Sequence, residues 1–110
     1  GYNTSAQNYA SSNATNTARS NWQTAENEAT KARNCAQRAR NRNTDQWNRK
    51  NDASRAEYAA NNANYAAQRA ESAAYIGDSQ ARGFAGRARQ AANRARQDAR
   101  QARYNADTMR

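Results

Sequence analysis

The stretch ARNCAQRARNRNTDQWNRKNDA, residues 32–53, begins and ends on alanine and repeats with a period of seven. Ala32, Ala39 and Ala53 occupy this period, and Gln46 is the one member that is not alanine. Seven residues make about two helical turns, so side chains at this spacing share one face of a helix. The stretch therefore predicts a helical face lined with methyl groups.

The same period covers most of the chain. Companion alanines three or four residues away accompany it, which is the spacing of a coiled-coil contact face. A heptad repeat sustained over this length predicts left-handed supercoiling of packed helices. We call the predicted contact row the alanine seam, and it consists of Ala18, Ala25, Ala32, Ala39, Ala53, Ala60, Ala67, Ala74, Ala81, Ala88, Ala95 and Ala102.

The composition favours helix and excludes a thick core. The chain has 110 residues, no proline and 4 glycines, and most of its 36% hydrophobic residues are alanine. Alanine has the highest helix propensity, and arginine, glutamine and glutamate follow closely. We expect an all-α fold: a long, nearly continuous alanine-rich helix that packs with other copies as a coiled coil or helical bundle.

Two segments are candidate breaks in this helix. Residues 43–52 carry turn-prone asparagine and aspartate, with Asp52 as the expected N-cap of the helix that follows. Residues 76–79 include Gly77, which can end a helix, and Asp78, which can cap the next one. The heptad phase is kept through both segments. We therefore expect continuous helix with local distortion, and a helical hairpin or a three-helix bundle is the alternative.

The N-terminal part differs from the rest. Residues 1–17 are rich in serine, asparagine and threonine and are predicted to form a polar arm or frayed helical start, followed by the alanine-heptad region 18–110. Asn3 and Asn13 lie in N-x-[ST] sequons and are candidate glycosylation sites. Gly1 in place of methionine indicates a processed chain, which fits an extracellular or cell-surface location.

The chain is strongly basic, with 18 Lys and Arg against 9 Asp and Glu and a net charge of +9. Such a charge favours anionic partners. One interpretation is a solvated flank that pairs with carboxylates of neighbouring helices, and the other is a ridge that follows phosphates of nucleic acid. The positions that directly follow seam alanines form a basic stripe, which consists of Arg19, Arg33, Arg40, Arg82, Arg89, Arg96 and Arg103.

Aromatic residues accompany the arginines. Tyr58 and Tyr65 are seven residues apart and flank the seam. Trp22 and Phe84 replace alanine in the companion rows, and the glycines near Phe84 predict a ring fitted into space made for it. The alternative is base stacking, because interleaved aromatics and arginines occur in single-strand binders.

Cys35 is the single cysteine, so no disulfide forms within the chain. We expect it to fill space beside the seam, or alternatively to form an intermolecular disulfide between adjacent copies.

Catalytic chemistry finds no support in the sequence. There is no histidine, and a lone cysteine without a histidine partner is a poor nucleophile. The nine scattered carboxylates form no metal-binding pattern, and no glycine-rich phosphate loop occurs. No hydrophobic run approaches the roughly 20 residues that span a bilayer. We expect no enzyme activity, cofactor, metal or small-molecule substrate.

The alanine rows between Ala18 and Ala106 resemble those of alanine-seamed coiled coils as a class, including the coiled-coil silks of bees and hornets. This resemblance rests on periodicity, and it implies a fibrous protein whose partners are identical copies of itself.

The expected function is therefore that of a self-assembling filament or fibre subunit, held by close alanine packing between arginine-flanked seams. The alternative is a basic helical protein that coats or condenses nucleic acid inside a cell or virion. A third hypothesis is ice binding, for which the only sign is the spacing of eleven residues between Thr4 and Thr15.

Overall fold

The computed structural model describes the backbone of residues 2–41 and 43–108, and the side chains of these residues from position 12 onward. These residues form three α-helices, α1 (Tyr2–Arg40), α2 (Gln46–Ile76) and α3 (Ser79–Thr108). No strand occurs within these ranges, which confirms the all-α fold class.

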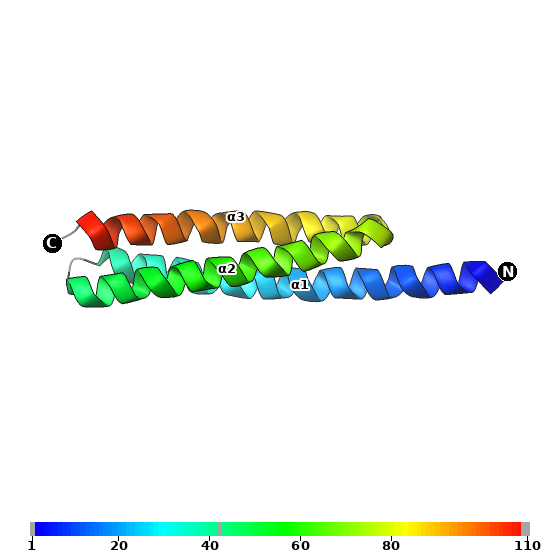
Figure 1. The fold of residues 1–110 in the computed structure, drawn as a ribbon, viewed down its shortest axis with the longest axis horizontal. Helices are drawn as coiled ribbons and strands as arrows, with labels where there is room; N and C mark the ends of the chain where they lie inside the picture. Colours follow the sequence, from blue (N-terminus) through cyan, green and yellow to red (C-terminus); the bar gives the residue numbers. More distant parts are fainter. Residues whose placement is uncertain (1, 42, 109–110) are drawn as a thin grey trace.

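The three helices form a slender bundle (Figure 1). Helix α2 runs antiparallel to α1 and α3, and each helix packs against both others. The bundle measures 67 × 14 × 13 Å along its principal axes. The prediction of one nearly continuous helix is therefore corrected: the chain folds back on itself at both candidate breaks, because folding back buries methyl groups that a lone helix leaves in water.

The first turn lies between Arg40 and Gln46 and is organised by polar side chains. The amide nitrogen of Asn43 donates to Asn41 Oδ1 over 3.0 Å. Asp45 is the N-cap of α2, and its Oδ1 accepts the backbone N–H of Asn48 over 2.8 Å. The expected cap at Asp52 is thus wrong, since α2 begins seven residues earlier than Ala53 and Asp52 is buried inside it.

The second turn consists of Gly77 and Asp78, which the sequence marked as a candidate break although continuous helix was expected there. The N–H of Gly77 donates to the carbonyl of Ala74 at the end of α2 over 3.2 Å. Asp78 Oδ1 accepts the backbone N–H of Ala81 over 3.0 Å at the start of α3. A carboxylate here satisfies an N–H that has no partner within the helix and lies favourably in the helix dipole.

The alanine seam forms the core of the bundle. All of its members are 8% exposed or less, and Ala18, Ala67 and Ala102 are fully buried. They pack in one hydrophobic cluster with the companion alanines and Cys35. The seam that was expected to join separate copies therefore joins the three helices of one chain.

The polar N-terminal segment, expected to be an arm or a helical start, is part of α1, which begins at Tyr2. Its first turns extend beyond the turn that connects α2 to α3 (Figure 1). Near the end of this extension, Ala14 and Thr15 are buried against the rest of the bundle.

Candidate anion-binding site

The basic stripe does not form one continuous ridge, because the bundle divides it between two grooves. On α3, Arg89 and Arg103 reach carboxylates of α2. On α1, the guanidinium of Arg19 lies 5.1 Å from the ring centroid of Phe84, which belongs to α3. The α3 part of the stripe thus follows the groove between α2 and α3, whereas Arg19 lies at the groove between α1 and α3.

Part of the stripe fastens helices together. Arg89 donates to both carboxylate oxygens of Glu71, at 2.6 and 3.2 Å, and to Asn64 Oδ1 at 2.7 Å. Arg103 donates to Glu57 over 2.6 Å and to Ser54 Oγ over 3.0 Å.

The hydrogen bonds from Arg89 to Glu71 raise the pKa of Arg89, and those from Arg103 to Glu57 raise the pKa of Arg103. Bidentate pairs of this kind fix the position of one helix against another. These two arginines therefore serve the fold, and their charges are balanced by the carboxylates that they hold.

Trp22 and Phe84 join α1 to α3. Their rings stack with centroids 5.4 Å apart and an interplanar angle of 26°. The guanidinium of Arg87 lies over Trp22 at 5.5 Å from the ring centroid, which is a cation–π distance. These two rings are covered by each other and by arginines, so they are not free for stacking on bases.

The glycines beside Phe84 do not make space for its ring, which corrects the sequence-based interpretation. A Cβ built at Gly83 or at Gly86 meets no atom within 4 Å. Both glycines lie on the exposed face of α3. Phe84 packs instead against Trp22 of the neighbouring helix.

Many other cations face solvent without a salt bridge. Nearly every carboxylate of the bundle is engaged with an arginine, a lysine or a helix N-terminus. In the part of the chain that the structure describes, the exposed cations without a salt bridge are Arg19, Arg33, Arg40, Lys50, Arg55, Arg69, Arg82, Arg87, Arg96 and Arg100. Of these, Arg19 and Arg87 lie over aromatic rings and Arg82 donates to the carbonyl of Gly77. The charge of the others is thus available to an anionic partner.

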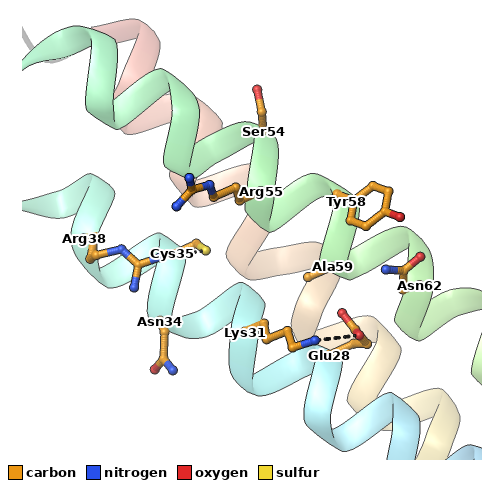
Figure 2. A pocket seen from close by; sticks show the side chains of 10 residues that line it. All are labelled: Glu28, Lys31, Asn34, Cys35, Arg38, Ser54, Arg55, Tyr58, Ala59 and Asn62. Atoms are coloured by element: carbon orange, nitrogen blue, oxygen red, sulfur yellow. Dashed lines mark hydrogen bonds and ion pairs between the residues drawn. The ribbon is translucent and has the colours of Figure 1, made fainter.

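The groove between α1 and α2 contains a pocket of about 490 Å³ in which cations meet an aromatic ring. Its lining comes from both helices (Figure 2): α1 contributes Lys31, Cys35 and Arg38, and α2 contributes Arg55 and Tyr58. The volume lies within the range of about 300–1,000 Å³ that is typical of small-ligand sites. Polar side chains, aromatic surface and positive charge therefore converge at this place.

The cations of this pocket differ in how strongly they are held. Arg38 donates to Asp52 Oδ1 over 3.2 Å and to the sulfur of Cys35 over 3.1 Å. Lys31 pairs with Glu28 over 3.1 Å, one turn away on the same helix (Figure 2). Arg55, in contrast, is exposed and makes no salt bridge within the described chain. Arg55 is thus the cation most available to a ligand here.

Cys35 is a free thiol at the floor of the pocket, 6% exposed. It packs within the alanine cluster, which confirms the prediction that it fills space beside the seam. The intermolecular disulfide stays a prediction.

The glycosylation candidates fall in α1. Asn13 is exposed, and Asn3 lies among the first residues, whose side chains are outside those described. Their modification stays a prediction.

Sequence reasoning did not predict that three polar residues are buried at the end of the bundle where α1 meets α2. Arg49, Asp52 and Asn105 are each 8% exposed or less. Arg49 donates to the carbonyl of Thr44 and so closes the first turn. The only sign in the sequence was Gln46, where the seam loses its alanine one turn before Arg49 and Lys50.

Two further features concern the described residues alone. They contain no cluster of three or more cysteine or acidic side chains arranged to hold a metal ion. None of their helices combines the length and the apolar character needed to cross a membrane.

Comparison of the chain with models of known families, with curated proteins and with solved structures finds no match in any of the three. The candidate site therefore stands on its own geometry and charge.

Proposed function

We propose that the protein is a basic three-helix bundle that binds nucleic acid. The observation that carries this proposal is the set of exposed arginines that make no salt bridge, on a chain with a net charge of +9. Phosphates along a nucleic acid attract such cations, and each neutralised phosphate releases counterions and adds to the affinity.

The burial of the alanine seam also supports this choice over a seam-joined fibre. The seam alanines are enclosed within one chain, so they offer no methyl face to another copy. Copies that each carry a charge of +9 repel one another, whereas a polyanion neutralises them. Nucleic acid therefore fits the exposed surface better than a second copy does.

Self-assembly into filaments is a second candidate, and the extension of α1 favours it. Helix α1 has 39 residues and α2 has 31, so α1 is longer by about 12 Å at a rise of about 1.5 Å per residue. Its N-terminal turns extend past the turn between α2 and α3 (Figure 1). End-to-end contacts through this extension would build a filament without using the seam.

The test is a titration of a labelled 20-base-pair duplex with the protein, followed by fluorescence anisotropy at several salt concentrations. We expect the logarithm of the binding constant to fall linearly with the logarithm of the salt concentration. The triple variant Arg33→Gln, Arg96→Gln, Arg100→Gln should bind the duplex more weakly than the unaltered chain does. The slope should become shallower by about 0.9 for each of these arginines that contacts a phosphate.

A matched control replaces exposed neutral side chains on the same helices, Gln37→Ala, Gln90→Ala, Gln97→Ala. This variant should bind as the unaltered chain does. Absence of binding at low salt would exclude the proposal. Polymers that form with rising concentration in the absence of nucleic acid, seen by light scattering, would favour the filament candidate instead.

A further inference from the structure

We propose that the ligand is single-stranded nucleic acid and that it lies along the groove between α1 and α2, where Tyr58 and Tyr65 stack on its bases. This inference rests on the proposed function and deepens it. It assigns the strand form of the ligand and its path on the bundle.

The groove is hollowed at two places in line with each other. The first pocket lies between residues 28–38 of α1 and residues 54–62 of α2. The second, of about 770 Å³, lies between residues 13–21 of α1 and residues 65–76 of α2. Because α1 and α2 are antiparallel, these segments follow one another along the same groove, which offers an extended path rather than one isolated pocket.

A tyrosine lies at each pocket. Tyr58 lines the first and is 70% exposed, and Tyr65 lines the second and is 60% exposed. Seven residues separate them on one helix, so their positions on α2 are about 10.5 Å apart at about 1.5 Å per residue. Unlike the rings of Trp22 and Phe84, which stack on each other, those of Tyr58 and Tyr65 make no ring contact within the described chain. Two open aromatic faces thus lie in line along the groove.

The charge of the groove is complementary to a phosphate backbone. The first pocket is lined by Lys31, Arg38 and Arg55 and by one carboxylate, Glu28. Lys31 pairs with Glu28 and Arg38 with Asp52, so Arg55 supplies the charge that no carboxylate of the described chain balances. Among the described residues that line the second pocket, Arg69 is a cation and none is a carboxylate. Positive charge therefore continues past both tyrosines.

The groove between α2 and α3 provides a comparison. Its pocket of about 870 Å³ has Arg96, Arg100 and Arg103 but also Glu57 and Asp107, and a single tyrosine, Tyr104. Arg103 is held by Glu57. Arg96 and Arg100 make no salt bridge within the described chain and can also attract phosphates. This groove differs from the groove between α1 and α2 in offering one ring rather than two in line.

The tyrosines distinguish single strands from duplexes. A ring stacks on the face of a base only when that face is not covered by neighbouring base pairs, as in single strands. Amide groups of Asn34 and Asn62 in the first pocket, and of Asn21 and Gln68 in the second, can bond to base edges that an unpaired strand exposes. Phosphate contacts by the arginines, in contrast, serve both forms.

The experiment measures binding of a labelled 20-nucleotide oligothymidylate and of a 20-base-pair duplex by fluorescence anisotropy. The unaltered chain should bind the single strand more tightly than the duplex. Tyr58→Ala, Tyr65→Ala should weaken single-strand binding by about tenfold per tyrosine and leave duplex binding within about twofold. Tyr58→Phe, Tyr65→Phe should restore single-strand binding, because stacking needs the ring and not the hydroxyl.

Tyr104→Ala is the matched control, since Tyr104 is 64% exposed and lies on the other groove. It should leave both affinities unchanged. Circular dichroism of each variant should show the helix content of the unaltered chain.

Two outcomes separate this inference from the proposed function. The first is unchanged single-strand binding by the double variant Tyr58→Ala, Tyr65→Ala, with duplex and single strand still bound in a salt-dependent manner. This result would contradict binding in the groove between α1 and α2 and would leave the proposal of nucleic-acid binding intact. Failure of the unaltered chain to bind either form would overturn both. If sedimentation shows a dimer that the tyrosine substitutions convert to monomer, a second copy occupies the groove and the inference is wrong.

Discussion

Thr15 and Asp78, 63 residues apart in the sequence, are joined by a hydrogen bond in which Thr15 Oγ1 donates to Asp78 Oδ1 over 2.9 Å. The same carboxylate oxygen accepts the backbone N–H of Ala81 over 3.0 Å. A single side chain therefore caps the start of α3 and fastens the turn between α2 and α3 to α1.

This arrangement predicts a dependence of stability on acid. The hydrogen bond from the backbone of Ala81, and then that from Thr15, lower the pKa of Asp78 below its ordinary value of 3.8. Because the folded-state pKa lies below the unfolded one, the stabilisation is complete above the unfolded value and is lost as the pH falls through the folded value.

Asp78→Ala should therefore lower the unfolding midpoint in urea at about pH 7, and the difference from the unaltered chain should shrink as the pH falls below about 4. Circular dichroism at 222 nm follows the unfolding. A difference that stays constant down to about pH 2 would show that the ionised carboxylate is not the source.

Gly77 lies so close to neighbouring atoms that the second turn has no space for a side chain at this position. A Cβ at this position would lie 2.5 Å from the Cβ of Ala81 and 3.2 Å from the carbonyl oxygen of Ala73. We expect Gly77→Ala to lower the free energy of unfolding by about 1–3 kcal/mol, since the turn must shift to admit the methyl group. Urea denaturation measures this change, and equal stability of the variant would contradict the packing described.

Gly83 and Gly86 should behave in the opposite way. Both are exposed within α3, and a Cβ at either meets no atom within 4 Å. Alanine at these positions should raise the free energy of unfolding by about 0.5–1 kcal/mol each, because glycine loses more conformational freedom when a helix forms. The same urea titration tests this. A loss of stability would mean that another part of the protein contacts the backbone there.

Ala67 tests the seam itself. It is fully buried between helices of the same chain. We expect Ala67→Leu to lower the free energy of unfolding by about 1–3 kcal/mol, because three added carbons have no space in a methyl-sized contact. The exposed neighbour gives the control: Gln68→Leu should change stability by no more than about 0.5 kcal/mol. Similar effects of the two substitutions would contradict a close-packed seam.

The core could be predicted from the sequence, whereas the path of the chain could not. The step of seven identifies the apolar face of every helix, and each seam alanine is buried. That step does not tell whether the face meets another copy or the chain itself. The turn at Gly77 and Asp78 leaves only two residues outside helices, and the spacing from Ala74 to Ala81 is still seven. A preserved phase is thus compatible with a reversal of direction.

Only the residue types of the candidate site, and the spacing of its tyrosines, could be predicted from the sequence. The sequence showed Tyr58 and Tyr65 seven residues apart, and it showed abundant arginine. It did not show that Arg89 and Arg103 are held by Glu71 and Glu57 while others remain without a salt bridge. The packing of the three helices decides which arginines meet a carboxylate and which remain available, and this packing exists only because the chain folds back on itself.

A core of methyl groups also affects how the protein responds to temperature. The heat capacity increment of unfolding grows with the apolar surface that becomes exposed, at about 0.45 cal/K/mol per Å². Alanine side chains contribute little such surface, so the increment should be small for a chain of 110 residues. The stability curve is then shallow, and cooling should weaken this bundle less than it weakens a protein of equal size built on leucine and phenylalanine.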